Sequence, residues 1–525
     1  MLGVTNVVND RTFNRAGVDC LPYPWKFMES NLCTIAFLDD FALLNRTQLT
    51  RRYFEPRIIE ESQFFDPNYS LSYSSMQWCP EVEKYRLWYN VNHQVCKVEI
   101  GGETQDEHFM LAMAESADAI HWERGNYLNR PDGANLVWSG EEGSVSGAMV
   151  YRDPHDADPE RRYKCAASLD SMRHGSQSIA PGIIATSPDG IHWNSQQLRY
   201  QWGRSMSDAY NCLFYNPVLG AYQVLFRAVL TDRRICTSYS SDLIHWSTPR
   251  VILAPDGNDP PCSEFYNMSA HYHDGIFYGF LCVFETDMVD RVPWKFKGNV
   301  YTELVYSYDG LSWQRTHQKA IGLRGIGEYG ATQNYLFNMT PNRKGDQWMI
   351  SGIFPLLEHG SATYSEHRTS LSNDSNRLVA HYTSTIQPGR LCGLQGVGDA
   401  FLRTKQFLLK DDQLTINAQC PHGEMKVQLI DIWQKPIAGF SFDDSERFSG
   451  DEIAWTPRWK ERSISELLGK RIGIEIRLYT GCVYGITGHF HPFHGALPQQ
   501  SYGDPRDIAE AVFGPTVDYS RIDPQ

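Results

Sequence analysis

Ala114-Glu-Ser-Ala-Asp-Ala-Ile-His-Trp122 is the first of four similar phrases that decide the fold of this chain. The other three are Thr186-Ser-Pro-Asp-Gly-Ile-His-Trp193, Tyr239-Ser-Ser-Asp-Leu-Ile-His-Trp246 and Tyr306-Ser-Tyr-Asp-Gly-Leu-Ser-Trp313. The closing tryptophans are 71, 53 and 67 residues apart. Helical solenoid repeats are shorter, roughly 20 to 50 residues, whereas these intervals suit four-stranded propeller blades with inserted loops. The chain is therefore predicted to be a β-propeller.

Each phrase has a physical role in such a blade. A Ser or Thr oxygen that precedes an Asp-Gly turn accepts hydrogen bonds from the amides of the turn. The tryptophan that ends the phrase places a large apolar ring in the space between neighbouring sheets. A hairpin turn alone would not require the recurring serine, the Ile or Leu and the tryptophan. The phrase therefore favours a propeller over a set of unrelated hairpins.

A second repeated unit precedes the phrases and consists of a β-rich strand, a Pro or Gly turn and an aromatic-rich strand. Its five copies are Leu71–Tyr89, Gly147–Cys165, Asn211–Arg227, Met268–Phe280 and Tyr335–Ile350. This pattern is typical of β-hairpins. Five hairpins predict five blades, and the first strand of each blade lines the central channel.

The repeat ends near residue 360, and the remainder of the chain has a different pattern. Phe407–Asn417, Met425–Asp431 and Ile472–Tyr479 alternate apolar and polar residues, as the strands of a β-sandwich do. We therefore predict an all-β chain, a five-bladed β-propeller followed by a β-sandwich. The expected divisions are an N-terminal extension (1–30), the propeller (31–360), a polar linker (361–376), the sandwich (377–490) and a C-terminal tail (491–525).

The charge of the chain limits its partners. Among 525 residues, 62 are acidic and 48 are basic, which gives a net charge of -14. This balance disfavours nucleic acid and anionic membranes and leaves a neutral carbohydrate as the expected partner. No stretch has the roughly 18 apolar residues of a membrane span, and the N-terminus has no signal-peptide pattern. We expect a cytoplasmic protein unless a leader was removed, and the tail is a candidate surface for a second copy.

The sequence requires no cofactor. Its 12 cysteines contain no Cys-x-x-Cys pair, so neither a zinc site nor a dense disulfide framework is indicated. No metal ligands are assigned. A channel ringed by acids is also a place where oxygen ligands can hold a calcium ion, and calcium on the propeller axis stays an alternative.

An acid stands ahead of each hairpin turn, where the first strand of a blade begins. These acids are Asp66, Glu142, Asp208, Glu264 and Glu328. The loops after the second strands add polar and aromatic candidates for substrate binding, namely Arg173, His174, Arg227, Trp294, Lys295, Glu358 and His359. Because both sets lie at the same end of a propeller, they are expected to form a polar cup with aromatic walls.

Acids around one channel can cleave glycosidic bonds. One carboxylic acid protonates the leaving oxygen, and a carboxylate across the ring acts as nucleophile or activates water, at about 5 Å separation for retention and roughly 6.5 to 9.5 Å for inversion. Neighbouring carboxylates and burial raise one pKa, while an Arg partner keeps the other group ionised. The stereochemical outcome, the sugar and the linkage stay open at this point.

The five hairpins with inward acids resemble the five-bladed β-propeller glycoside hydrolases, the superfamily that contains families 32, 43, 62 and 68 and the related family 130 phosphorylases. The chain looks more closely like family-32-like proteins that open with Phe37-Leu-Asp-Asp40, carry Ser-x-Asp-Gly-x-x-Trp phrases and end in a β-sandwich. The resemblance covers about residues 30 to 490. It implies a glycosidase, with a furanoside or an oligosaccharide end as substrate.

The resemblance also suggests roles for single residues. Phe65-Asp66-Pro67-Asn68 partly matches the nucleophile motif of family 32, which makes Asp66 the candidate nucleophile or base. Arg152-Asp153-Pro154 matches the family's triplet in letters, yet it falls at a hairpin turn and is expected outside the channel. The chain has no Glu-Cys pair, so the acid role is carried by analogy to Asp208 and Glu264. Glu142 and Glu328 are expected to orient these groups or to hold hydroxyls.

Two alternatives remain. In a phosphorylase, a basic cluster such as Arg173, His174 and Lys295 would bind phosphate in place of water. In a non-catalytic carbohydrate-binding propeller, the acids would only hydrogen-bond to sugar hydroxyls. Phosphate dependence separates the first alternative from a hydrolase, and binding without turnover identifies the second.

Overall fold

The structure is a computed structural model, and it forms two units. It describes residues 32–93, 98–100, 103–105, 108–138, 145–169, 172–174, 177–179, 182–194, 209–229, 232–292, 295–360 and 377–492. One unit is Glu55–Pro388, and the other combines Met1–Phe54 with Gly389–Gln525.

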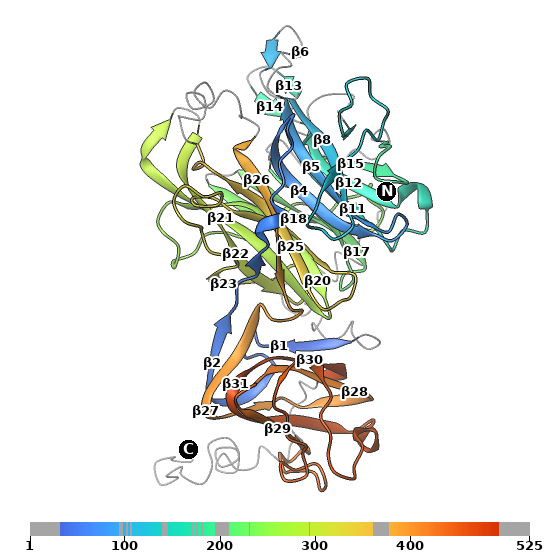
Figure 1. The fold of residues 1–525 in the computed structure, drawn as a ribbon, viewed down its shortest axis with the longest axis vertical. Helices are drawn as coiled ribbons and strands as arrows, with labels where there is room; N and C mark the ends of the chain where they lie inside the picture. The colour runs from blue at the N-terminus through green and yellow to red at the C-terminus, as the bar shows by residue number, and fades with distance from the viewer. Residues whose placement is uncertain are drawn as a thin grey trace. The chain divides into compact units, whose positions relative to one another are not determined.

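Glu55–Pro388 is a five-bladed β-propeller, as predicted (Figure 1). From the innermost strand outwards, blade I consists of β4 (Ser70–Cys79), β5 (Lys84–His93), β8 (His108–Ser116) and β10 (Leu136–Trp138), with β9 (Glu123–Arg124) also on β8. Blade II consists of β11 (Val145–Arg152), β12 (Tyr163–Leu169) and β15 (Gly182–Ser187). Blade III consists of β16 (Cys212–Asn216), β17 (Ala221–Val229), β18 (Arg233–Ser240) and β19 (Arg250–Leu253).

Blades IV and V complete the circle. Blade IV consists of β20 (Ser263–His273), β21 (Ile276–Val292), β22 (Lys295–Ser307) and β23 (Trp313–Lys319). Blade V consists of β24 (Tyr335–Pro341), β25 (Trp348–Pro355), β26 (Val379–Ile386) and β3 (Arg57–Ile58). Two small hairpins, β6 (Val98–Ile100) with β7 (Glu103–Gln105) and β13 (Met172–His174) with β14 (Gln177–Ile179), and the 3-10 turns η1 (Glu60–Ser62) and η2 (Pro159–Arg161) lie in the connections.

The five innermost strands form a closed ring. Each of β4, β11, β16, β20 and β24 contacts the next, and β24 contacts β4. The ring is closed by the start of the unit, because β3 pairs with the last strand, β26, through Ile58↔Ser384 and Arg57↔Thr385. The blue β4 therefore lies beside the orange β26, although the two are far apart in the sequence (Figure 1).

The four phrases form the hydrogen-bonded turns that their sequence predicts. The serine Oγ lies 2.9 to 3.0 Å from the aspartate Oδ1 in each turn. The same Oδ1 accepts the backbone N–H groups two and three residues further on, at 2.7 to 2.9 Å. The residue after the aspartate is left-handed in every copy, with φ between 63° and 76° at Ala119, Gly190, Leu243 and Gly310.

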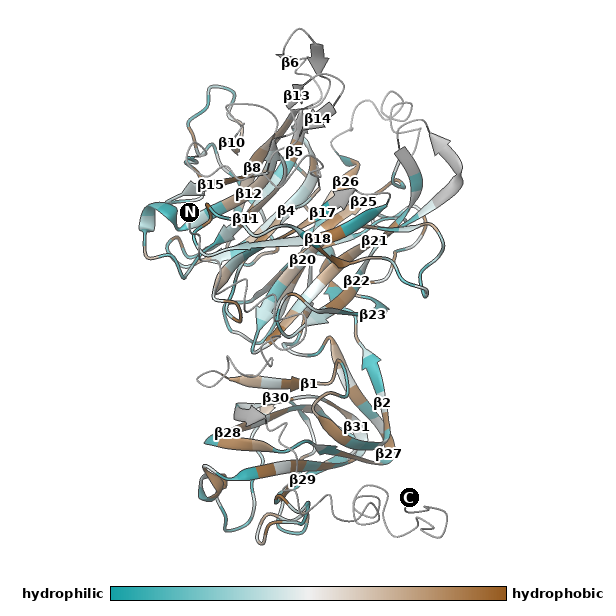
Figure 2. Cartoon of the chain, turned by 180° about the vertical axis from the view of Figure 1, so that it is seen from behind, coloured by the Kyte–Doolittle hydropathy of each residue, from teal (hydrophilic) through white to brown (hydrophobic). Residues whose placement is uncertain are grey.

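The turns also join neighbouring blades. Thr383 Oγ1 in blade V donates to Ala119 O in blade I at 2.7 Å, and Trp88 Nε1 in blade I donates to Gly190 O in blade II at 2.8 Å. Gln223 Nε2 in blade III donates in the same way to Gly310 O in blade IV at 2.7 Å. The phrase tryptophans pack against the apolar clusters of the propeller, as predicted. Apolar residues, brown in Figure 2, run along the strands that form these clusters.

The other unit is a seven-stranded sheet folded over a core of its own. Its strands are β1 (Cys33–Ala36), β2 (Leu43–Tyr53), β27 (Cys392–Thr404), β28 (Phe407–Gln419), β29 (Glu424–Ile430), β30 (Asp451–Trp455) and β31 (Arg471–Pro492), with the 3-10 turn η4 (Ile464–Leu467). The first half of β31 pairs with β27 and β29, and its second half pairs with β28 and β1. One strand thus links two layers, which enclose a buried apolar cluster.

The observed units differ from the expected divisions at two points. Strands β1 and β2 lie within the stretch expected in the propeller, yet they pair with β31 and β27 of the other unit. Strand β26 lies within the stretch expected in the sandwich, yet it pairs with β25 and forms the third strand of blade V. Both differences come from pairings between distant segments, for which the local sequence carries no signal.

Candidate active site

The site lies where the innermost strand of blade IV begins. Tyr266 is a bulge residue in β20, because the pairing with β21 shifts between Phe265 and Asn267. A bulge re-aims a side chain and is common at the rims of barrels and beside active sites. The residues around Tyr266 come from three blades, and we call them the mouth cluster: Arg227, Arg233, Glu264, Tyr266, Phe284 and His359.

Glu264 is the carboxylate of the mouth cluster. It forms an ion pair with Arg233 of β18, and its side chain keeps 16% of its surface exposed. The Arg233 guanidinium also lies 5.5 Å from the centre of the Phe284 ring and 5.9 Å from that of Tyr266. An ion pair held between aromatic rings has a defined orientation, because the planar guanidinium stacks and donates at once.

Tyr266 is the residue to which the other members converge. Arg227, at the end of β17, lies 4.8 Å from the centre of the Tyr266 ring, and its Nη1 donates to Tyr266 O at 3.5 Å. The Tyr266 hydroxyl lies 3.3 Å from His359 Nε2, in the loop after β25. The Phe284 ring contacts both of them, with its centre 4.5 Å from that of His359 and 6.1 Å from that of Tyr266.

An aromatic cluster fills the space between the innermost strands. Tyr73, Tyr210 and Phe337 lie 4.8 to 6.1 Å apart, although they come from blades I, III and V. Tyr335 connects this cluster to the mouth, because its ring is 6.2 Å from Phe337 and 5.5 Å from Tyr266. The cluster gives the mouth a rigid floor of packed rings.

Three predicted residues are therefore brought together: Glu264, Arg227 and His359. Tyr266, which unites them, was not predicted from the sequence. A signal for it exists, because Ser263-Glu-Phe-Tyr-Asn267 repeats the pattern of Ser207-Asp-Ala-Tyr-Asn211 one blade earlier.

Asp66 has a different environment from the one expected. It is fully buried and does not lie on an innermost strand. Its carboxylate accepts from the Tyr89 hydroxyl at 2.6 Å and from the Asn68 N–H at 2.8 Å, and Arg124 of the outer strand β9 lies 3.3 Å away. Burial, the Asp66 charge and this hydrogen bond raise the pKa of Tyr89 well above its usual value. The hydrogen bonds and the ion pair of Asp66 are thus to residues in or just before blade I.

The remaining described candidates lie in loops. Glu328 is 55% exposed and forms an ion pair with Arg324, which also pairs with Glu60. Glu358 is half-buried beside His359. Asp153 follows the end of β11 and is bound by Lys164 and Tyr222, so the Arg-Asp-Pro triplet lies at a hairpin turn, as predicted.

Several candidates lie outside the described residues, namely Glu142, Asp208 and Trp294. Arg173 and His174 belong to β13, and Lys295 begins β22, but their side chains are likewise not described. Their roles stay predictions.

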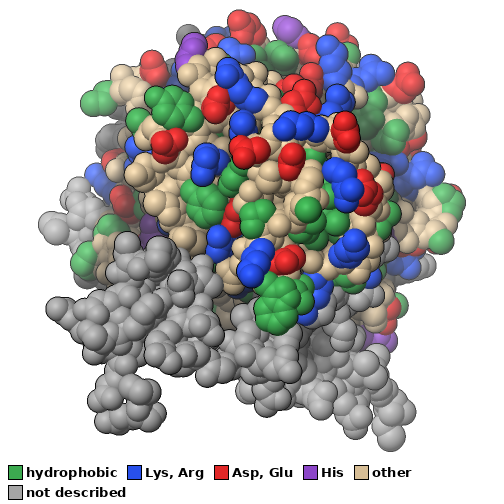
Figure 3. All heavy atoms as spheres, turned by 90° about the horizontal axis from the view of Figure 1, so that it is seen from below, with side chains coloured by type: hydrophobic (Ala, Val, Ile, Leu, Met, Phe, Trp, Pro, Cys, Tyr) green, Lys and Arg blue, Asp and Glu red, His purple; other side chains and the backbone are tan. Residues whose placement is uncertain are grey.

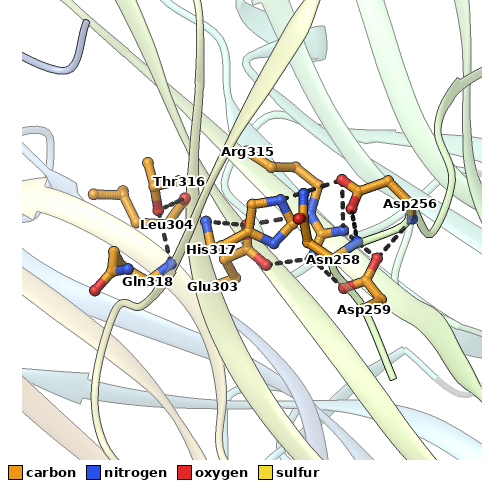
Figure 4. Close-up of polar contacts among 9 residues, drawn as sticks. All are labelled: Asp256, Asn258, Asp259, Glu303, Leu304, Arg315, Thr316, His317 and Gln318. Atoms are coloured by element: carbon orange, nitrogen blue, oxygen red, sulfur yellow. Dashed lines mark hydrogen bonds and ion pairs between the residues drawn. The ribbon is translucent and has the colours of Figure 1, made fainter. Parts of the chain in front are cut away.

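A second cluster of charged groups lies in blade IV and fastens a loop (Figure 4). Arg315 Nη2 donates to Glu303 at 2.5 Å and to Asp259 at 2.8 Å, while His317 Nε2 lies 3.2 Å from Asp256. Although burial opposes both ionised forms, their mutual hydrogen bonds hold the pKa of Arg315 above and that of Asp259 below the usual value. Arg315 is bound by three carboxylates of the protein, and we interpret the cluster as structural.

Two further searches concern the described part of the chain. No group of three or more His, Cys, Asp or Glu residues there is arranged to hold a metal ion. No helix within it has the length and apolarity to cross a bilayer. On the face drawn in Figure 3, Lys and Arg side chains are interspersed with Asp and Glu side chains.

Comparisons with known proteins concern the fold. No protein-family model matches the sequence, and no curated protein matches it. The chain is similar to the Bombyx mori family-32 β-fructofuranosidase, with 10% identity and a TM-score of 0.39 over 83% of this chain and 95% of that one. A thermostable family-43 glycoside hydrolase has 11% identity and a TM-score of 0.39, over 62% and 92%.

An N-acetylgalactosamine deacetylase from F. plautii, in complex with blood group B trisaccharide, has 14% identity and a TM-score of 0.41, over 66% of this chain and 97% of that one. Because a fold does not by itself establish an activity, the function of this chain has to be argued from its own site.

Proposed function

We propose that the chain is a glycoside hydrolase that acts on a carbohydrate at the mouth of its propeller. One observation carries this proposal: Glu264, a partly exposed carboxylate, is ion-paired to Arg233, and Arg233 lies over the ring of Tyr266, which in turn contacts Arg227 and His359. Aromatic faces, a guanidinium and an oriented carboxylate are the groups with which proteins bind sugars and stabilise a positively charged anomeric centre.

In this proposal Glu264 acts at the anomeric carbon, as nucleophile or as electrostatic stabiliser. Asp208 is proposed as the second carboxylate, because the Ser-acid-x-Tyr-Asn pattern places it one blade earlier at the position of Glu264. A furanoside is the proposed substrate, and it rests on the resemblance of the sequence to the family-32-like proteins.

A panel of nitrophenyl furanosides and pyranosides, with and without phosphate, tests the proposal. We expect the wild type and a Glu446→Gln control, which changes an exposed carboxylate, to cleave one glycoside without phosphate. Glu264→Gln is expected to lose this activity. Cleavage that requires phosphate would instead identify a phosphorylase, and binding of sugars without any cleavage would identify a binding propeller. Either result contradicts a hydrolase.

A further inference from the structure

The mouth cluster contains a proton-carrying pair beside Glu264. The Tyr266 hydroxyl and His359 Nε2 are 3.3 Å apart, and their rings meet edge to face at 5.1 Å and 73°. Both the backbone and the ring of His359 are held in place. The backbone exchanges two 3.2 Å hydrogen bonds with Gly298, and the ring packs on Phe284. The contact is therefore set by the fold.

Glu264 is poorly placed to give a proton away. Its carboxylate is ion-paired with Arg233, so at least one of its oxygens already accepts a charged hydrogen bond. A carboxylate in this state suits the nucleophilic or stabilising role, whereas the leaving oxygen of a glycoside needs a proton donor. Tyr266 is two residues away on β20, and its ring centre lies 5.9 Å from the Arg233 guanidinium that pairs with Glu264, so both side chains border the same arginine.

We infer that Tyr266, backed by His359, is the proton donor of the reaction. This inference rests on the proposed function. When the glycosidic bond breaks, its electron pair goes to the leaving oxygen, which takes the phenolic proton of Tyr266. Water then supplies the oxygen of the new bond at the anomeric carbon. Its released proton returns to the Tyr266 phenolate by way of the His359 imidazole, so that one water is consumed for each bond cleaved.

The dependence of the rate on the leaving group tests this role. A dinitrophenolate leaves without taking up a proton, whereas the leaving oxygen of a methyl glycoside or of a sugar has to be protonated as the bond breaks. With the sugar that the wild type cleaves best, we expect Tyr266→Phe to lower kcat/KM by roughly 100-fold for the methyl glycoside and by less than about 3-fold for the dinitrophenyl glycoside. His359→Gln is expected to change the two rates in the same unequal way.

Tyr335→Phe is the matched control, because Tyr335 is a neighbouring buried tyrosine whose hydroxyl donates to Gln333. It should not alter the ratio of the two rates. Equal losses on both substrates in Tyr266→Phe would overturn the inference, because a purely structural role does not depend on the leaving group. The same would follow if Asp208→Asn, and not Tyr266→Phe, gave the unequal losses. A wild type that cleaves no glycoside would instead overturn the proposed function itself.

Discussion

The sequence predicted that the carboxylates of Asp66 and Glu264 both face the central channel, and the structure gives them different surroundings. Asp66 is enclosed, with Tyr89, Asn68 and Arg124 all directed at its oxygens. Glu264 forms an ion pair with Arg233 and keeps 16% of its side-chain surface exposed. Both residues precede or begin the first strand of a blade.

This difference leads us to expect different roles for the two carboxylates. A carboxylate that accepts three hydrogen bonds from the protein, as Asp66 does, has little acceptor capacity left for a substrate. A carboxylate with one oriented partner and an open side can face a reacting centre. Substitution should therefore affect stability at Asp66 and turnover at Glu264.

The largest expected effect is on turnover at Glu264. Glu264→Gln should lower kcat by roughly 1,000-fold, because the amide cannot act as nucleophile or carry the negative charge that stabilises the anomeric centre. Its denaturation midpoint should stay close to that of the wild type, since the residue is partly exposed. Steady-state kinetics and urea unfolding of the same preparation measure both. A large loss of stability with unchanged kcat would reverse the assignment of the two carboxylates.

The stability of the propeller should depend on pH because two of its histidines are buried. Burial lowers the pKa of His271 to about 4 and that of His381 to about 3, the first against a hydrogen bond with the Phe337 backbone. Unfolded histidines titrate near 6.5, so between these values the unfolded chain binds more protons. The free energy of unfolding should therefore fall as the pH drops below about 6.5, by about 2 kcal/mol per histidine at pH 5.

Thermal or urea unfolding at pH 7 and pH 5 measures this slope. His381→Gln should reduce the pH dependence by the share of one histidine, whereas His155→Gln, which changes an exposed ring, should leave it unaltered. A stability that stays constant from pH 7 to pH 5 would contradict the burial of neutral histidines in blades IV and V.

The fold could be predicted because its signals are local. In each phrase the hydrogen bonds join a serine, an aspartate and amides within six consecutive residues, and each hairpin is continuous in sequence. The closure of the ring by β3 and the pairing of β1 and β2 with the sandwich strands join segments that are hundreds of residues apart. Such pairings depend on the assembled sheets, and no short motif announces them.

The site could be predicted in part for the same reason. Glu264 was found because the start of an innermost strand follows from the hairpin pattern. Phe-Asp-Pro-Asn predicts the local Asp66–Asn68 turn, which does form, but it carries no signal for Tyr89 and Arg124, which enclose the carboxylate from other strands. Tyr266 was missed because its role depends on a bulge and on a histidine 93 residues later.

At Asp66 the expected effect is on stability. Asp66→Asn removes a charge that Arg124 faces and weakens the bonds from Tyr89, so we expect a loss of about 3 kcal/mol in the free energy of unfolding. The kcat of the folded fraction should stay within about 2-fold of the wild type. Urea unfolding and kinetics under native conditions test both statements. Loss of turnover without loss of stability would restore Asp66 as a catalytic carboxylate.

The smallest expected effect is on stability at Gly190, the residue that follows Asp189 in the turn of blade II. Gly190 has φ 76°, and a Cβ there would lie 2.7 Å from the Trp88 ring, whose Nε1 donates to Gly190 O across the blades. Gly190→Ala should therefore cost about 2 kcal/mol of stability, from the left-handed backbone and the displaced ring. Ala119→Gly, at the matching left-handed position of blade I, should change stability by less than about 1 kcal/mol.

Equal effects of the two substitutions in urea unfolding would show that the contact between blades contributes nothing beyond the turn. A larger loss for Gly190→Ala with unchanged kcat would show that the contact between this turn and Trp88 holds the propeller together and takes no part in turnover.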